Sequence, residues 1–372
     1  MVRAYHLGPG HGRLGGAPIA SRPARRPVIK LEVRVLSFHR LPLGEVDWQV
    51  LDGFGDRLLM QRRGWLEFVR AITGGEIVIA QIEQDGQTAG FFTGILFRRC
   101  GVPILGSPFR GWNTAYMGFN LHPDVSRVAA LRGLEQFAFR QLGCLHYEVT
   151  DRYLSPEESG RLGLAFRVVQ NYQTDLTRSE DELFADMDSA CRRAIRKAQK
   201  SGITIEHAAP EGFAEEYYGH LLDVFAKQDM KPTYPLDRVK KLIEHVHPSG
   251  DLLLARVRDP EGRSIATGIY AGFGRFGLFW GNGSLRPYQH YRPNEALHWH
   301  SMRYFKQQGL PLYDWGGRAT YKTKYGVVPF SLLAFRKSRF GVIQYARDLA
   351  EKIYYYPRTL RRARYKASVG AR

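Results

Sequence analysis

Two stretches of the chain carry the pattern of a β-hairpin. Residues 76–97 contain two β-rich runs around an Asp-Gly pair, and residues 251–273 contain two more around a Pro/Gly turn. Runs of β-branched and aromatic residues that flank such turn residues predict antiparallel strand pairs. The chain therefore begins two similar units about 175 residues apart, measured from Ala80 to Ala255.

Each predicted hairpin is followed by a helical pattern and then by a short strand. Proline just inside a helix and glycine just past its end are the expected boundary residues. The strands end in tyrosine and an acid. The predicted helices run from near Pro123 to before Gly143 and from near Pro293 to before Gly309, and the strands cover 144–151 and 310–317. Four features in the same order predict a duplication.

The repeat predicts an α/β (α+β) fold of two modules packed side by side, with mixed central sheets and flanking helices. We place the modules at residues 31–175 and 176–340. A basic, Gly/Pro/Arg-rich segment at 1–30 is predicted to be disordered, and 341–372 to be a basic C-terminal helix or tail. With 372 residues and 44% hydrophobic content, the chain can build two cores.

The net charge of +18 is concentrated at the ends. Residues 1–30 carry six Lys/Arg and residues 352–372 carry seven, with no acid in either, and the remainder holds 41 basic and 36 acidic residues. A nearly balanced body does not indicate nucleic-acid binding. The C-terminal tail is either a solvated tail or a peripheral contact with anionic membrane or RNA.

Other features of the composition indicate where in the cell the protein is found. No run approaches 18 apolar residues, and no apolar segment follows the basic N-terminus, so neither a membrane span nor a secretory signal is expected. Three widely spaced cysteines are typical of reduced thiols. We therefore expect a cytoplasmic protein, at the inner face of the membrane if its tail makes that contact.

One predicted helix is strongly basic on one side. Ser179 and Glu182 form a capping-box pattern, and Gly202 is a suitable terminator, so one helix is expected between them. Its apolar stripe includes Cys191, while five cations fall within 192–200 with no acid among them. Such a face is either solvated or binds a polyanion such as a phosphate, a pyrophosphate or an RNA backbone.

Three ordered motifs resemble the FemAB-like family of peptidoglycan-bridge aminoacyltransferases and related GNAT-type acyltransferases. They are RRAIRKAQKSGITIE at 192–206, YDWGG at 313–317 and YKTKYG at 321–326. The stretch RPNEALHW at 292–299 resembles the family's Pro-Asn helix start. The resemblance implies two N-acetyltransferase-like (GNAT) modules, the second catalytic, and acyl or aminoacyl transfer to a cell-envelope or exopolysaccharide precursor.

The resemblance leaves the acyl donor open between aminoacyl-tRNA and acyl-CoA, with no tightly bound cofactor. Only about fifty residues separate Gly202 from Leu252, too few for the long helical arm of many bridge-forming members. The stretch 286–294 contains no glycine, whereas simple GNAT enzymes use glycines there to approach the CoA pyrophosphate. The acceptor would be a nucleotide- or lipid-linked sugar or peptide, and tRNA would be a partner only as donor.

By the same resemblance, Lys322 faces the reacting carbonyl, where a cation could stabilise the oxyanion. Asp314 either positions the acceptor amine or caps the Gly316-Gly317 turn. The alternative for Lys322 is a surface lysine in a basic loop. Lys322 and Asp314 are the catalytic candidates.

The substrate-binding candidates surround this pair in the sequence or lie on the basic helix. Arginine forks suit the phosphates of activated sugars, and aromatic or amide side chains could line a groove, although core packing is the ordinary alternative. The candidates are Arg193, Arg196, Lys197, Tyr321, Gly316, Gly317, Trp280, Asn282 and Asn294, with Arg110 and Trp112 in the first module.

Several apparent motifs are rejected. GFGRFG at 272–277 lies between β-like runs with no helix after it, so it predicts a hairpin turn and not a dinucleotide site. His298 and His300 are two positions apart in a helix and point in different directions, so no metal site is expected. The leading hypothesis is a FemAB-like transferase. The alternatives are an acyl-CoA-dependent N-acyltransferase of the same fold, or a non-catalytic module that binds glycan precursors or nucleic acid.

Overall fold

The computed structural model describes residues 36–154, 166–226 and 230–353. The strands are β1 Ser37–Leu41, β2 Glu76–Gln84, β3 Gln87–Arg99, β4 Val102–Ser107, β5 Gly118–Leu121, β6 His146–Asp151, β7 Phe166–Asp175, β8 Thr204–His207, β9 Leu252–Arg258, β10 Ser264–Phe273, β11 Phe276–Ser284, β12 Leu312–Gly317 and β13 Val328–Ser338. The helices are α1 Trp48–Asp52, α2 Arg63–Thr73, α3 Arg127–Gln136, α5 Glu180–Asp186, α6 Ser189–Lys200, α7 Phe213–Ala226, α8 Leu236–Val246, α9 Pro293–Gln307 and an unlabelled helix at 341–353. Shorter 3-10 turns are η1 Leu43–Glu45, η2 Leu59–Gln61, η4 His247–Ser249, η5 Arg286–Tyr291 and η6 Thr320–Tyr325, and η3 Phe137–Gln141 is a π-helix.

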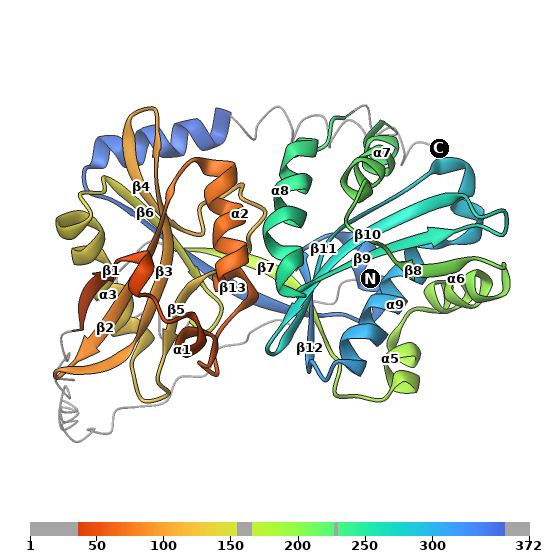
Figure 1. The fold of residues 1–372 in the computed structure, drawn as a ribbon, viewed down its shortest axis with the longest axis horizontal. Helices are drawn as coiled ribbons and strands as arrows, with labels where there is room; N and C mark the ends of the chain where they lie inside the picture. The colour runs from red at the N-terminus through yellow and green to blue at the C-terminus, as the bar shows by residue number, and fades with distance from the viewer. Residues whose placement is uncertain (1–35, 155–165, 227–229, 354–372) are drawn as a thin grey trace, which may run out of the picture. The chain divides into compact units, whose positions relative to one another are not determined.

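The repeated units predicted from the sequence are both present (Figure 1). In the first, the hairpin β2–β3 precedes α3 and β6, and in the second the hairpin β9–β10 precedes α9 and β12. In both units a parallel strand pair marks the centre: β4 with β6, and β11 with β12. The remaining ladders of the described chain are antiparallel.

The two units join through an exchange of strands. The described strands form one sheet in the order β1-β2-β3-β4-β6-β13-β7-β12-β11-β10-β9-β8, with β5 beside β3. β7 follows β6 in the chain but pairs with β12 of the second unit, and β13 follows β12 but pairs with β6 of the first. β7 and β13 also pair with each other. Neither strand belongs to one unit alone, so the predicted boundaries at 175 and 340 stay a prediction.

Alternating residues along the strands serve two faces of the sheet. In β2, Ile77 and Ile79 belong to a core under α2, α7 and α8 that runs through both units. Val78 and Ala80 face the other way, into a core under α3. The corresponding core of the second unit lies under α6 and α9. This period of two is what the hairpin pattern predicts for strands covered on both faces.

The single helix expected between Ser179 and Gly202 is wrong, because the structure contains two. Ser179 and Glu182 do form a capping box at the start of α5. That helix ends at Asp186, the next residue Met187 has an extended backbone, and the Asp188 carboxylate accepts a hydrogen bond from the Cys191 N–H to start α6. Asp188 is a second N-cap within the segment, and it starts a new helix where the prediction had one continuous helix. The predictions for residues 1–30 and 354–372 lie outside the described residues.

Candidate active site

The parallel strands of the second unit separate soon after they meet. The ladder between β11 and β12 ends at Leu278 and Asp314. Just past that point β11 has a bulge against β10, with Trp280 as the extra residue between Phe279 and Gly281. A bulge re-aims side chains and ends regular pairing. The region beyond the last ladder pair is therefore where a ligand can meet the backbone of both strands.

Lys322 lies at this divergence. It is carried by η6, only 6% of it is exposed, and its Nζ donates hydrogen bonds to the Trp315 carbonyl and, at 2.8 Å, to the Gly317 carbonyl. The ammonium also lies 5.3 Å from the ring centroid of Phe279 on β11. Gly316 between the two carbonyls has φ +66°, which side chains with a Cβ rarely adopt, so the glycine allows both carbonyls to turn toward Nζ. Lys322 is therefore not a surface lysine.

Burial changes the titration of Lys322. Loss of hydration lowers the pKa of its ammonium from 10.5 to about 8, with the nearby charge of Asp314 opposing the shift. A charged amine in an apolar setting is disfavoured, and this is the physical cause. At neutral pH Lys322 is still a cation, but one that exchanges its proton near physiological pH.

Asp314 is held inside a network that joins the two units. Its side chain is fully buried, and Oδ2 accepts hydrogen bonds from Arg152 Nη1 at 2.7 Å and from the Tyr116 hydroxyl at 3.0 Å. Oδ1 accepts from the Gly316 N–H at 2.8 Å, which caps the turn. Burial raises the pKa of Asp314, and the positive charge of Arg152 opposes this rise. Of the two roles left open for Asp314, the contacts favour the structural one.

Arg152 and Tyr116 were not predicted from the sequence. Both come from the first unit, and Arg152 also donates to Gln173 Oε1 at 2.8 Å. The Arg152 guanidinium lies 4.2 Å from the ring centroids of Phe276 and Phe330. The first unit thus fixes the turn whose carbonyls hold Lys322.

On the other face of the sheet, Trp280 packs against two tyrosines. Its ring centroid is 5.0 Å from that of Tyr234 and 6.1 Å from that of Tyr217, and the two tyrosine hydroxyls are 2.8 Å apart. The Trp280 Nε1–H is buried and has no hydrogen-bond partner in the described part of the chain. A Cβ on Gly281 would collide with the Tyr217 hydroxyl. Trp280 therefore lies at the bulge with an indole N–H that is available as a hydrogen-bond donor.

The predicted amides and Tyr321 have different surroundings. Asn282 Nδ2 donates to Asn294 Oδ1 at 2.9 Å, and Asn294 Nδ2 donates to Ser284 Oγ at 2.9 Å, so the two amides join β11 to the first turn of α9. Tyr321 is 49% exposed beside Lys322, with its ring centroid 5.8 Å from the Lys322 ammonium. Tyr321 is the predicted residue with the most surface next to that lysine.

His298 on α9 is a third residue, after Arg152 and Tyr116, that the sequence did not single out for the site. Its ring centroid lies 4.7 Å from Phe279 and 5.0 Å from Trp315, and Nδ1 has no hydrogen-bond partner in the described ranges. Burial lowers the pKa of His298 to about 3, helped by the charge of Lys322. A neutral imidazole therefore forms part of the wall behind the ammonium.

The basic residues of α6 are not brought to Lys322. Arg193, Arg196 and Lys197 are exposed, and we find no hydrogen bond, ion pair or ring contact among the described residues that links them to the divergence of β11 and β12. The guanidinium of Arg196 lies 5.1 Å from the ring centroid of Phe184 on α5. Their predicted role in binding the acceptor phosphates stays a prediction without a structural link to the site.

The two first-module candidates have partners inside the protein. Arg110 forms an ion pair with Glu351 of the helix at 341–353. Trp112 is 5% exposed, with ring centroids 5.2 Å from Phe97 and 6.1 Å from Phe109. A core ring leaves little surface for an acceptor, and the binding role predicted for Trp112 stays a prediction.

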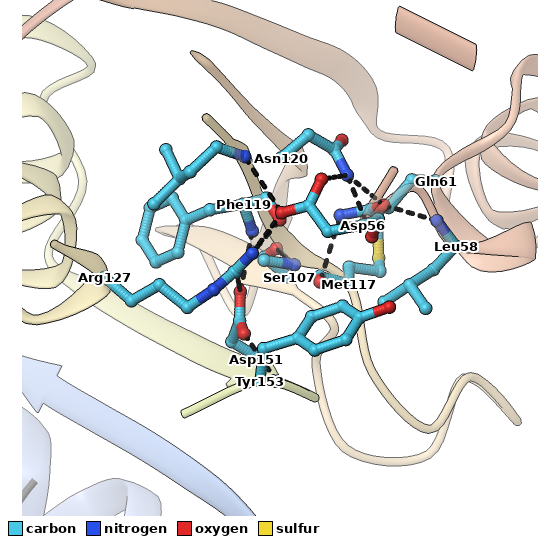
Figure 2. A network of polar contacts seen from close by, with 12 residues as sticks. Asp56, Leu58, Gln61, Ser107, Met117, Phe119, Asn120, Arg127, Asp151 and Tyr153 are labelled. Atoms are coloured by element: carbon cyan, nitrogen blue, oxygen red, sulfur yellow. Dashed lines mark hydrogen bonds and ion pairs between the residues drawn. The ribbon is translucent and has the colours of Figure 1, made fainter. Parts of the chain in front are cut away.

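The end of β6 in the first unit carries a different network, shown in Figure 2. Asp151 Oδ2 accepts from Arg127 Nη1 at 2.8 Å and from the Phe119 N–H at 3.0 Å, and Oδ1 accepts from the Tyr153 N–H at 2.8 Å. Arg127 also pairs with Asp56. A cavity of about 540 Å³ lies beside Asp56 and Arg127. Both charges are paired within the protein, so this cavity offers no free charged group, and we do not take it as the candidate site.

Metal ligation and membrane spans were also considered. In residues 36–353, the described ranges hold no group of three or more His, Cys, Asp or Glu side chains suited to a metal ion. None of the described helices is long and apolar enough to cross a membrane.

Comparisons with known proteins agree with this description. Residues 185–324 match the family described as acetyltransferase (GNAT) domain. Among solved structures, the chain is similar to FemX, with a TM-score of 0.62 and 14% identity over 79% of this chain and 96% of that chain. It is also similar to a tandem GNAT protein from the clavulanic acid biosynthesis pathway, with a TM-score of 0.47 and 11% identity over 82% and 98% of the two chains. L-PGS from Bacillus licheniformis gives a TM-score of 0.45 and 14% identity over 76% and 95%. No curated protein sequence matches the chain.

The fold shared with FemX confirms the predicted fold class, and the matched domain confirms the resemblance to GNAT-type acyltransferases. They assign no role to individual residues, so the site residues stay predictions.

Proposed function

We propose that this chain, whose residues 185–324 match a GNAT acetyltransferase domain, transfers an acyl or aminoacyl group to an amine or hydroxyl of a cell-envelope or exopolysaccharide precursor. The observation that carries the proposal is the position of Lys322. An ammonium has three donors, and Lys322 uses two of them on the carbonyls of Trp315 and Gly317. Among the described residues we find no acceptor for the third N–H, and the ammonium lies where the strands diverge.

Lys322 would act on the donor carbonyl. The acceptor nitrogen or oxygen attacks the acyl carbon, and the negative charge that develops on the carbonyl oxygen is stabilised by the third N–H of the ammonium. The tetrahedral intermediate collapses as the bond to the leaving thiol or ribose oxygen breaks, and the acceptor's proton ends on that leaving group. A fixed cation in a site with little water supplies more stabilisation than the same cation in bulk water.

The transfer is direct in this proposal. Cys191 is the described cysteine nearest in sequence to the motif residues, but it is 1% exposed and burial raises the pKa of its thiol to about 12. A thiol of that kind supplies almost no thiolate at neutral pH. An acyl-enzyme intermediate on Cys191 is therefore not part of the mechanism.

The acceptor would approach along the face that carries Trp280 and Tyr234, opposite α9. Aromatic faces suit the apolar side of a sugar ring, and the unpartnered Trp280 Nε1–H can donate to a ligand oxygen. Gly316 and Gly317 keep the turn beside Lys322 free of side chains. The expectation of a cytoplasmic protein at the inner face of the membrane belongs to this proposal.

The donor is either aminoacyl-tRNA or acyl-CoA, and ligand-dependent stability distinguishes the two. The purified full chain is heated with acetyl-CoA, longer acyl-CoAs, a non-hydrolysable aminoacyl-RNA, UDP-linked sugars and UDP-muramyl peptide. A ligand at about a hundred times its Kd stabilises the folded state by about 2.7 kcal/mol, which is visible as a rise in Tm.

A rise in Tm with one donor and one acceptor supports the proposal and names both. Lys240, exposed and paired with Glu215 on the surface, provides the matched control Lys240→Met beside Lys322→Met. Loss of the donor shift in Lys322→Met alone places the donor at the divergence. The absence of a shift with every donor and acceptor would contradict the transferase and favour a binding module.

A further inference from the structure

The outer face of α6 carries positive charge that the protein does not neutralise. Arg193, Arg196, Lys197 and Lys200 are exposed. None of the four forms an ion pair with a carboxylate of the described residues. Cations four positions apart on a helix repel one another. Arg192 differs, because it donates to the carbonyls of Ala185 and Met187 at the end of α5.

An apolar cavity lies beside this face. Its volume is about 140 Å³, and it is formed by one side of α6, one side of α9 and the segment that leads into β8. α6 and α9 lie side by side in Figure 1. The lining residues are Ile195, Ala198, Gln199, Ile203, Ile205, Ala296, Trp299, His300 and Arg303.

Arg196 is linked to the cavity through Phe184. Its guanidinium lies 5.1 Å from the ring centroid of Phe184, and Phe184 lies 5.6 Å from the ring centroid of Trp299, which lines the cavity. Arg303 on α9 contributes a guanidinium to the lining, and its Nε donates a hydrogen bond to Glu180 Oε2 at 2.7 Å. α6 thus carries the exposed cations and also contributes Ile195, Ala198 and Gln199 to the apolar recess.

We propose that the α6–α9 surface binds an anionic lipid bilayer, which goes beyond the proposed transfer reaction. The phosphates of the headgroups would lie against Arg193, Arg196, Lys197 and Lys200, and the recess would take apolar lipid atoms beside Trp299. A cationic helix face next to apolar side chains is the chemistry of interfacial binding. Nucleic acid would match the charges but would leave the apolar recess without a partner.

The first test compares binding of the full chain to vesicles of phosphatidylcholine alone and of phosphatidylcholine with phosphatidylglycerol. One cation near an anionic surface contributes about a fivefold factor in partitioning. The triple variant Arg193→Glu/Lys197→Glu/Lys200→Glu should therefore bind the anionic vesicles at least about a hundredfold more weakly. Wild type and variant both keep the basic segment at 352–372, so its contribution is the same in both.

The matched control places the same charge change elsewhere. Arg98, Arg99 and Arg132 are exposed in the first unit, away from α6. The variant Arg98→Glu/Arg99→Glu/Arg132→Glu should lose much less vesicle binding than the α6 variant. Equal losses would show that only net charge matters and would overturn the proposal. A loss of tRNA binding in the α6 variant with vesicle binding unchanged would assign the face to RNA and would also overturn it.

A second measurement tests the recess without changing any charge. Trp299 is 8% exposed and is one of six tryptophans. Vesicles with brominated acyl chains should quench part of the tryptophan fluorescence of the wild type on binding. In Trp299→Phe that part should disappear while vesicle binding itself is kept. The same quenching in Trp299→Phe would mean that lipid does not reach the recess, and the proposal would fail.

Discussion

Replacing Lys322 with methionine should stabilise the folded chain at neutral pH while it removes the proposed catalytic cation. Burial lowers the pKa of Lys322 from 10.5 to about 8. A lowered pKa means that the folded state holds the proton less tightly than the unfolded state does. Below pH 8 both states are protonated, and the folded state carries a penalty of about 3 kcal/mol for the buried charge. The penalty fades as the pH rises from about 8 to 10.5.

The assay is urea denaturation of wild type and Lys322→Met at about pH 7.5 and about pH 9.5. Other groups titrate in both proteins, so their effects cancel in the difference between the two. The stability of the wild type relative to the variant should rise by about 2 kcal/mol between these conditions. At neutral pH the gain in Lys322→Met is reduced by the two carbonyls that lose their donor. A difference that does not change with pH would refute the burial of a titrating ammonium at this position.

Three further predictions concern the surroundings of Lys322. Transfer activity should fall as the pH rises through about 8, because the Lys322 ammonium loses its proton. In a folded Lys322→Arg variant, the fall in activity should move to higher pH. A pH–rate profile of each protein measures these two effects. Arg152→Met should lower the free energy of unfolding by about 3–5 kcal/mol, because it leaves the buried Asp314 charge unpaired. The double variant Arg152→Met/Asp314→Asn should lose clearly less than the sum of the two single changes. A double-mutant cycle by urea denaturation measures this, and two effects that simply add would refute it. Gly281→Ala should lower the Tm, because the added methyl group collides with the Tyr217 hydroxyl. Adding Tyr217→Phe to this variant should recover part of the lost Tm. No recovery would contradict this packing of Gly281 against Tyr217.

The repeat could be predicted because each of its signals depends on residues that are close in the sequence. These signals are the hairpin turns, the helix boundaries at Pro293 and Gly309, and the strand ends in tyrosine and acid. The exchange of β7 and β13 depends on which of two similar edges each strand meets, and no local pattern encodes that choice. The break between α5 and α6 was encoded, because Asp188 is a good N-cap, but the apolar stripe that continues through it concealed the signal.

Only part of the candidate site could be predicted from the sequence. Lys322 was found through its motif, yet its burial depends on the backbone turn at Gly316 and on the ring of Phe279 from another strand. Arg152 and Tyr116 reach Asp314 from more than 150 residues away in sequence, at separations of 162 and 198 residues. Contacts of that range arise from the packing of the two units.

The central claim is that Lys322 stabilises the oxyanion of a direct acyl transfer, and single-turnover transfer measured by mass spectrometry tests it most directly. Wild type, Lys322→Met, Lys322→Arg and the surface control Lys240→Met are compared with the donor and acceptor found by the stability screen. The account predicts a loss of about 10²–10³ in the transfer rate for Lys322→Met, partial activity for Lys322→Arg and full activity for Lys240→Met. Transfer by Lys322→Met at the wild-type rate, with donor and acceptor both bound, would contradict it.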